Sequence, residues 1–358
     1  MEVFPESVVL KIFSYLSTGE LVRVSRVNSE WQRIAHDWQL WRVVNLAKYS
    51  KNIDDLTLRK LVRSSFKAKL KYLDLTRFNI STGTLHLIKI TSSAIETLIL
   101  KYATFCESQK NFPEISYFPH NLKALNIAQS TGPTTVYRNI IESLGKDTLE
   151  SLVIGDEFLE LFTENKLNFL NFFQRQRLTL EALEFSFCKE LTDDWLKQIL
   201  ICCKNLRFLC VRRCRRVEGE FLRFILDICP FLRTLICDGI KISDENFKVP
   251  DWSRCMLVEL DLSRCRCVTE DGLLSMLPKL KFLRYLSVSC CGYGHALTDK
   301  VLKAMAGKSW KFLETLDVSF SCEITCRPLE AFVEKCPNLS KISKTNCPKL
   351  WIEVIPPD

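Results

Sequence analysis

The sequence predicts an α/β protein in which a short, purely helical N-terminal segment is followed by a curved solenoid of strand–helix units. Three observations predict this architecture: a six-residue apolar pattern that recurs eleven times, cysteines at fixed offsets from that pattern, and about forty N-terminal residues that do not repeat. One strand and one helix cannot close a core alone, so such units must stack. Stacking is expected to place parallel strands on the concave side and helices on the convex side.

The repeated pattern is L-x-x-L-x-φ, in which φ is an apolar residue. Its copies begin at Leu70, Ile95, Leu122, Leu149, Leu180, Leu206, Leu232, Leu257, Leu283, Leu313 and Leu339, at intervals of 25 to 31 residues, and the last copy lacks the final apolar residue. Alternate residues of a strand face the same side, so each copy is expected to form a short strand with one buried face. An amphipathic segment follows, as in "LTDDWLKQILICC", where Leu196, Ile199 and Leu200 share one face of a helix.

The cysteines follow the same repeat. Of the 17 cysteines, eight lie either eight residues after or three residues before a starting leucine. A small, nearly apolar side chain suits an inward-facing turn. We therefore expect burial, a reduced thiol and no metal at the five that follow the strands: Cys188, Cys214, Cys265, Cys291 and Cys347.

A metal site or cofactor is not expected. The pair Cys265-x-Cys267 has no second pair or nearby histidine to complete a zinc site, and the cluster of Cys290, Cys291 and His295 lacks a fourth ligand. The period of the repeat lies within the range of leucine-rich repeats, and the placement of the cysteines resembles their cysteine-containing subtype.

Composition and motifs argue against catalysis and against a membrane span. The four histidines are scattered over different repeats, and no glycine-rich phosphate loop, nucleophile motif or paired-carboxylate motif is present. No apolar run approaches the roughly 20 residues that a membrane span needs. The net charge of +8 permits an acidic partner without demanding nucleic acid. Many cysteines without a signal-like N-terminus indicate a reducing compartment, so we expect the cytoplasm, the nucleus or both.

Residues 4–41 precede the repeats and are expected to form three short helices. Ser17 and Glu20 form a capping-box pattern at the start of the second helix, and Asn28 can cap the third. Apolar residues cover more than one face of the first helix, although a unit of this size can bury little surface by itself. Some of them therefore need a surface outside the segment, either on the solenoid or on another protein.

This segment resembles the F-box, whose pattern runs Leu-Pro, Ile-Phe-Ser-x-Leu, Leu-x-x-Val-x-x-Val-Cys-x-x-Trp and Leu-Trp. The sequence matches it without gaps, with Phe4 in place of leucine and Asn28 in place of the frequent cysteine. The resemblance implies that the segment docks on a Skp-type adaptor. The residues implied for docking are Phe4, Pro5, Val8, Val9, Ile12, Phe13, Leu16, Leu21, Val24, Val27 and Trp31.

An F-box followed by leucine-rich repeats resembles the substrate receptors of cullin-based ubiquitin ligases, which are not themselves catalytic. The expected organisation is an F-box at 1–46, a linker, cap or partial repeat at 47–69, repeats at 70–350 and a short tail at 351–358. Two alternatives remain: a repeat protein that serves as a binding scaffold or inhibitor, and an F-box protein that acts outside a ligase.

Outward-facing residues of the concave strands are the candidate substrate site. They are Phe208, Arg212, Arg213, Asp261 and Arg264. Arginine pairs bidentately with carboxylate and phosphate, and strands about 4.8 Å apart would set these guanidinium groups roughly 10 Å from each other. We therefore expect an acidic or phosphorylated segment of a target protein. The alternatives are solvated charges that maintain solubility, or a role in nuclear import or nucleic-acid binding.

Overall fold

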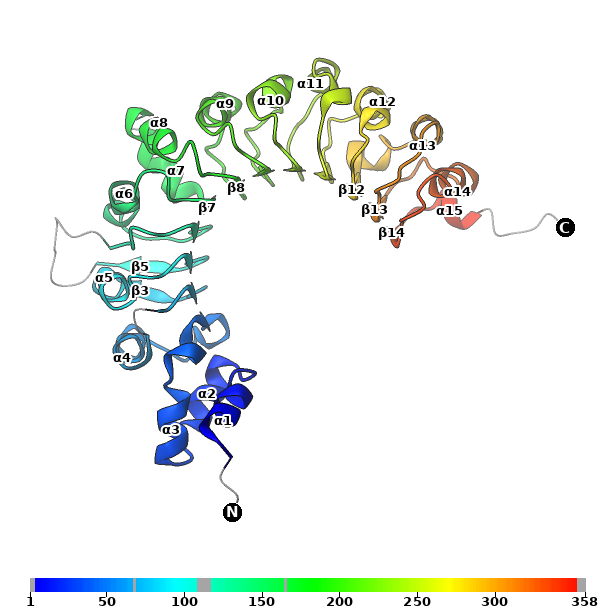
Figure 1. Cartoon of the computed structure of the whole chain (residues 1–358). Helices are drawn as coiled ribbons and strands as arrows, with labels where there is room; N and C mark the ends of the chain where they lie inside the picture. Colours follow the sequence, from blue (N-terminus) through cyan, green and yellow to red (C-terminus); the bar gives the residue numbers. More distant parts are fainter. Residues whose placement is uncertain (1–3, 67–68, 108–116, 164–165, 353–358) are drawn as a thin grey trace. The chain divides into compact units, whose positions relative to one another are not determined.

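The computed structural model describes residues 4–66, 69–107, 117–163 and 166–352 (Figure 1). The chain forms two compact units, Met1–Glu164 and Asn165–Asp358. Within the described ranges, no helix is both long and apolar enough to cross a membrane. Of the expected C-terminal tail at 351–358, residues 353–358 lie outside the described residues.

The first unit begins with the three short helices that the sequence predicts. They are α1 (Glu6–Phe13), α2 (Thr18–Val24) and α3 (Ser29–Ala35), followed by the 3-10 turn η1 (Trp38–Trp41). Both predicted caps are confirmed. The Ser17 amide donates to the Glu20 carboxylate over 2.7 Å, and the Trp31 amide donates to the Asn28 side-chain oxygen over 2.7 Å.

Five parallel strands of the first unit follow these helices in the order β1, β2, β4, β6 and β7. Their bounds are Val43–Asn45, Tyr72–Asp74, Thr97–Ile99, Ala124–Asn126 and Ser151–Ile154. A second pair consists of β3 (Asn79–Ser81) and β5 (Thr104–Cys106). The helical elements are η2 (Ala47–Tyr49), α4 (Asp55–Ser65), α5 (Thr82–Thr91), α6 (Thr134–Ser143) and α7 (Asp156–Thr163).

The solenoid starts one repeat earlier than the leucine pattern indicates. Strand β1 pairs with β2 in a register that aligns Val44 with Leu73, which makes Trp41 the equivalent of the starting leucine at position 70. Helix α4, in the segment expected to be a linker, cap or partial repeat, packs against α5 as the helices of later repeats do. The pattern W-x-x-V-x-L was missed because tryptophan and valine replace two leucines.

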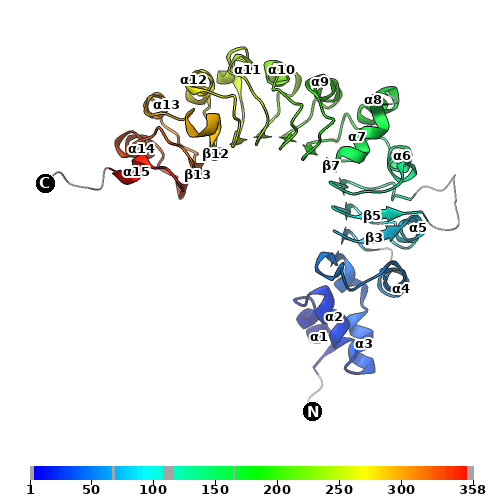
Figure 2. The ribbon, with the colours of Figure 1, turned by 180° about the vertical axis from the view of Figure 1, so that it is seen from behind.

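The second unit carries seven parallel strands in chain order, β8 to β14. Their bounds are Ala182–Phe185, Phe208–Cys210, Thr234–Ile236, Glu259–Asp261, Tyr285–Ser287, Thr315–Asp317 and Lys341–Ser343. The register places the central apolar residues of neighbouring strands side by side. Figures 1 and 2 show these strands along the concave side of this unit and its helices along the convex side, as predicted.

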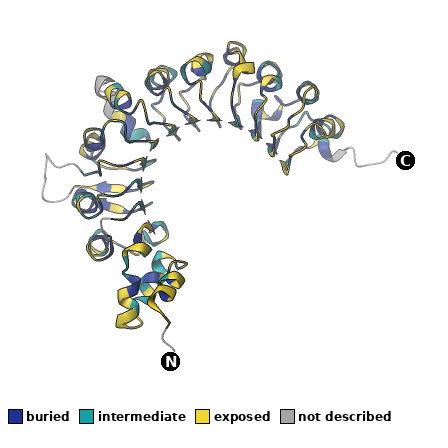
Figure 3. Cartoon of the chain, in the orientation of Figure 1, coloured by how far each residue is buried: buried dark blue, intermediate teal, exposed yellow. Residues whose placement is uncertain are grey.

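The helical elements of the second unit vary in length from repeat to repeat. The α-helices are α8 (Lys166–Arg175), α9 (Asp193–Cys202), α10 (Leu222–Ile228), α11 (Glu245–Lys248), α12 (Glu270–Met276), α13 (Asp299–Ala306), α14 (Cys326–Val333) and α15 (Lys349–Ile352). The 3-10 turns are η3 (Trp252–Arg254), η4 (Leu277–Lys279) and η5 (Cys291–Gly294). In each unit, buried residues gather between the strands and the helices (Figure 3).

The turn after each strand has a recurring geometry that ties one repeat to the next. Seven residues after the starting position, most repeats have a residue with φ between 53° and 73°, for example Arg213, Gly239 and Arg264. The buried cysteine follows. The Cys214 thiol donates to the Phe185 carbonyl of the preceding repeat over 2.9 Å, and Cys265, Cys291 and Cys347 make equivalent bonds of 2.9–3.2 Å.

The predicted burial of the five turn cysteines is confirmed. The structure also gives a reason for cysteine at this position. A thiol is small enough for the turn and still supplies a weak donor to a backbone carbonyl of the preceding repeat.

Candidate protein-docking sites

The helices of residues 4–41 expose an unusual amount of apolar surface. The side chains that are 40% or more exposed are Phe4 (64%), Val8 (40%), Ile12 (50%), Tyr15 (77%) and Val27 (59%). Pro5 is exposed as well. Large exposed apolar side chains close together in the chain indicate a surface that another protein covers.

The remaining predicted docking residues lie deeper. Val9, Phe13 and Leu21 are buried, while Leu16, Val24 and Trp31 are partly buried. Phe13 and Trp31 pack edge to face with ring centroids 5.4 Å apart. The buried residues therefore hold α1 against α3. They affect a docking partner only indirectly, because they fix the positions of the exposed apolar side chains.

Tyr15 was not predicted, although it lies inside the matched Ile-Phe-Ser-x-Leu motif at the variable position. It is the most exposed of these apolar side chains, and the Lys11 ammonium lies 5.3 Å from its ring centroid. An exposed ion pair between Glu6 and Arg33, with two bonds of 2.8 Å, joins α1 to α3. The Arg33 guanidinium lowers the pKa of the Glu6 carboxyl mainly by hydrogen bonding.

The concave face of the second unit contains all five predicted substrate-site residues. Phe208 begins β9, and Arg212 and Arg213 lie in the turn after it. Asp261 ends β11, and Arg264 lies in the turn after β11. Arg213 and Arg264 occupy the same repeat position, with φ of 58° and 60°. One repeat, containing β10, separates the two groups.

That intervening repeat supplies a carboxylate that the basic pattern of the sequence did not indicate. Asp238 is 1% exposed, and the Arg264 guanidinium donates two hydrogen bonds to it, one of 2.7 Å from Nε. Arg212 Nε lies 3.3 Å from the same carboxylate. The Asp238 carboxylate, through hydrogen bonding, raises the pKa of Arg264 further. The candidate substrate site therefore does not present Arg212 and Arg264 as two unpaired cations. Both guanidinium groups converge on the Asp238 carboxylate.

Gly239 accommodates the third arginine. It has a φ of 73°, and a Cβ at this position would lie 2.9 Å from Cδ of Arg213. The side chain of Arg213 thus crosses the turn of the next repeat, where the positive φ favours glycine.

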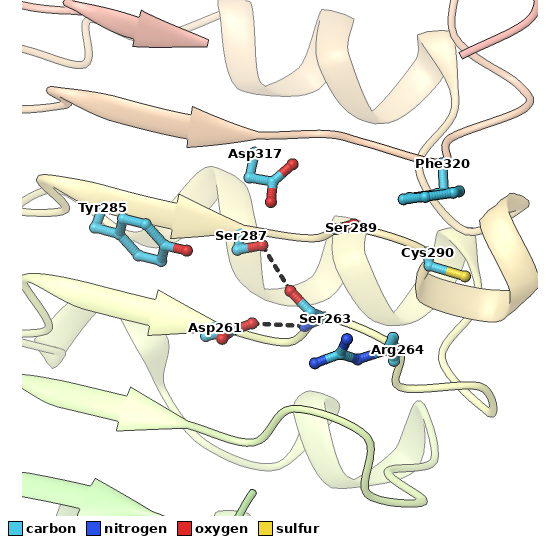
Figure 4. Close-up of a pocket in the computed structure, with 9 residues that line it drawn as sticks. All are labelled: Asp261, Ser263, Arg264, Tyr285, Ser287, Ser289, Cys290, Asp317 and Phe320. Atoms are coloured by element: carbon cyan, nitrogen blue, oxygen red, sulfur yellow. Dashed lines mark hydrogen bonds between the residues drawn. The ribbon is translucent and has the colours of Figure 1, made fainter. Parts of the chain in front are cut away.

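A pocket of about 410 Å³ lies next to Arg264 on the concave face (Figure 4). It is lined by Asp261, Ser263, Arg264, Tyr285, Ser287, Ser289, Cys290, Asp317 and Phe320. The residues come from β11, β12 and β13 and the turns after them. The Ser263 and Ser287 hydroxyls are 2.6 Å apart and form its floor. Burial, followed by the nearby Asp261 carboxylate, raises the pKa of Tyr285.

Among the residues that the structure describes, no three histidine, cysteine or acidic side chains are placed to hold a metal ion. Burial raises the pKa of the Cys237 and Cys291 thiols well above the ordinary value. Such thiols remain protonated and are poor metal ligands and nucleophiles. The site on residues 4–41 presents apolar side chains, and the site on the concave face presents charged groups and hydroxyls.

The comparisons with known proteins agree with this arrangement. Residues 1–47 match the F-box-like family. A stretch of 46 residues is 48% identical to F-box/LRR-repeat protein 12 of Homo sapiens and 46% identical to that of Bos taurus. It makes up 13% of this chain and spans only 14% of the length of those relatives.

Two solved structures resemble the fold of the whole chain. A chain in the crystal structure of the Rad7 and Elc1 complex of yeast matches with a TM-score of 0.59 and 16% identity, covering 96% of this chain and 89% of that one. An internalin of Listeria monocytogenes matches with a TM-score of 0.50 and 12% identity, covering 91% and 87%. At these identities the likeness shows the fold alone, a leucine-rich-repeat solenoid.

Proposed function

We propose that this chain, an F-box protein whose remaining residues form a leucine-rich-repeat solenoid, is the substrate-recognition subunit of a cullin-based E3 ubiquitin ligase. Its F-box-like segment docks on a Skp-type adaptor, and its solenoid holds a target protein. The observation that carries the proposal is the exposed apolar surface of residues 4–27, which the segment itself leaves uncovered.

The proposed mechanism is proximity. The chain makes and breaks no bond; it keeps target lysines near a ubiquitin-charged enzyme that the cullin recruits. Tethering of this kind raises the effective concentration of the reacting groups without a new catalytic contact.

The join between the docking segment and the first repeat supports the proposal. Trp41 is the last residue of the matched F-box pattern and also the first core residue of the solenoid. Its Nε1 donates to the Ala35 carbonyl over 2.7 Å, and its ring lies 6.3 Å from that of Phe66 at the end of α4. A docking segment joined to the first repeat through a shared core is held firmly to it, as a receptor that positions a target requires.

The experiment is a binding titration between the purified full-length chain and a purified Skp-type adaptor. Ile12→Ala together with Tyr15→Ala removes two side chains that are 50% and 77% exposed and support little of the fold. Central apolar side chains of an interface typically cost about 2 kcal/mol or more on truncation, so Kd should rise at least about 30-fold.

The matched control is Ile90→Ala. Ile90 is 61% exposed on α5, outside the F-box-like segment, so the same substitution at similar exposure should leave Kd unchanged. Wild-type affinity in the Ile12 and Tyr15 variant, or no adaptor binding by the unaltered chain, would overturn the proposal.

A further inference from the structure

The pocket on the concave face exists because one repeat carries small residues between two that carry large ones. The repeat of β12 places Ser287, Ser289 and Cys290 along the strand end and turn. At the positions equivalent to Ser287 and Cys290, the preceding repeat has Asp261 and Arg264, and the following repeat has Asp317 and Phe320. Figure 4 shows the small side chains at the centre and the larger ones on either side.

The carboxylates of Asp261 and Asp317 face the pocket from opposite sides and occupy the same position in their repeats. The register of β11, β12 and β13 aligns Asp261, Ser287 and Asp317. Since neighbouring strands lie about 4.8 Å apart, the two aspartates are roughly 10 Å apart with Ser287 midway. A positively charged group seated above Ser287 would be within reach of both.

Each carboxylate keeps one oxygen available. Oδ1 of Asp261 accepts the Ser263 amide over 2.9 Å, and Oδ1 of Asp317 accepts the Ser319 amide over 2.9 Å. None of the ion pairs formed by the described residues includes Asp261 or Asp317. Their second oxygens therefore carry charge that the solenoid does not pair.

Arg264, the one cation among the residues that line the pocket, does not make the net charge of the pocket positive. Arg264 directs its guanidinium to Asp238 of the preceding repeat, so its charge is matched there. Among the residues that line the pocket, the carboxylates of Asp261 and Asp317 outnumber the guanidinium of Arg264 by one. The pocket is consequently anionic, the opposite of the polarity expected from the arginines in the sequence.

We propose that this pocket binds a lysine or arginine side chain of the target protein. The inference rests on the proposed function, since it names the chemistry of the target that the receptor would hold. The guest cation bridges Asp261 and Asp317, with the Ser287 hydroxyl below it. The rings of Tyr285 and Phe320, the latter 46% exposed, flank the pocket and suit the aliphatic stem and the charge of such a side chain.

Cys290 provides a reporter within the pocket. Its thiol is partly exposed in the lining, whereas Cys267 is exposed outside the lining and serves as an internal reference in the same molecule. The probes are unstructured Gly/Ser peptides with one central arginine, lysine, glutamate or phosphoserine. They are used at about 1 mM, because a site for a single side chain binds with Kd on the order of 1 mM. Iodoacetamide alkylation of each cysteine is followed by mass spectrometry of the full-length protein.

Arginine and lysine peptides should slow alkylation of Cys290 about twofold, since half of the pockets are occupied at a concentration equal to Kd. Cys267 should react at an unchanged rate. In the Asp261→Asn and Asp317→Asn double variant the protection should disappear. Asparagine keeps the turn intact, since Asn126 at the equivalent position of an earlier repeat accepts the Ala128 amide over 3.0 Å.

Equal protection by glutamate or phosphoserine peptides, no protection by any peptide, or protection that survives in the double variant would each overturn the proposal. The adaptor titration distinguishes a failure of the pocket proposal from a failure of the proposed function, because it measures adaptor docking alone. The double variant should bind the adaptor with wild-type affinity, and the Ile12 and Tyr15 variant should retain the protection of Cys290.

Discussion

Asp238 and Arg264 form a bidentate ion pair across two adjacent repeats, with the carboxylate buried and the guanidinium half-exposed. The pair joins the turn after β10 to the turn after β11, and Arg212 approaches the same carboxylate from the other side. A buried carboxylate that loses its hydrogen-bond partners is costly, so Asp238 is central to the packing of three successive turns.

Replacing Asp238 by asparagine should lower the free energy of unfolding by about 1–3 kcal/mol, because the charge-assisted interactions with both arginines are lost. The measurement is urea unfolding of the full-length protein followed by circular dichroism. Glu150→Gln is the control, since Glu150 forms only an exposed pair with Lys123 and its loss should leave the midpoint unchanged. Equal midpoints for the Asp238 variant and the wild type would contradict this interpretation of the turns.

Cysteine reactivity should divide according to the repeat position. In the native protein, Cys106 and Cys267 are exposed and should react with a maleimide within minutes. The five turn cysteines should react only after unfolding, because they are buried and burial raises the pKa of the Cys265 and Cys347 thiols. Mass spectrometry of labelled peptides distinguishes the two groups. Rapid native labelling at the turn cysteines, or stoichiometric zinc by elemental analysis, would show that their expected role is wrong.

The protein should lose stability at alkaline pH. Burial raises the pKa of the Cys210, Cys229 and Cys336 thiols from 9.0 to about 12 and that of Cys255 to about 11. Between pH 9 and 12 the unfolded chain therefore binds fewer protons than the folded one, and the free energy of unfolding falls as pH rises. Urea unfolding at a series of pH values measures this slope.

Tyr137 contributes to the upper part of the same window. Burial raises the pKa of its hydroxyl from 10.0 to about 12, and the hydroxyl donates to the Ser130 carbonyl over 2.8 Å. Tyr137→Phe should be less stable than the wild type at neutral pH but should show a shallower loss of stability above pH 10. Parallel pH profiles for the two proteins would exclude this contribution.

Trp41→Ala should destabilise the first unit strongly, by about 3–5 kcal/mol, because the side chain is 3% exposed and its removal leaves a large cavity. Trp38→Ala is the matched control. Trp38 is 36% exposed with the Lys69 ammonium 3.8 Å from its ring, and its loss should have a small effect. Hydrogen exchange should show α3 and α4 losing protection together in the Trp41 variant. Loss confined to α3 would argue against a shared core.

The regular features of this fold were predictable because they repeat. The leucines of the strands and the five turn cysteines recur at constant offsets, so the spacing alone was enough to infer that they share one environment. The first repeat was missed because Trp41 and Val44 break the leucine pattern while keeping its apolar spacing. The tryptophan was assigned to the F-box pattern alone, although one residue can serve both.

The charged residues of the concave face were harder to predict, since their partners depend on the stacking of neighbouring turns. Arg212 and Arg264 appeared to form one basic strip because Asp238 lies between them in a separate repeat, 26 residues from each. Aligning the repeats on their starting leucines would have placed Asp238 beside Arg212 and would have grouped Asp261 with Asp317. The pocket was not predictable in this way, because it arises from side-chain size in three adjacent turns.

The double role of Trp41 limits how this chain can be divided or recombined. A graft that exchanged residues 1–41 for another docking segment would remove the first layer of the solenoid core along with them. Deletion of residues 1–41 would likewise expose Val44, Leu46 and Phe66, which are all buried in the intact chain. The smallest segment that can be transferred to another protein therefore extends through the end of α4. The docking helices and the first repeat must be kept together in any redesigned chain.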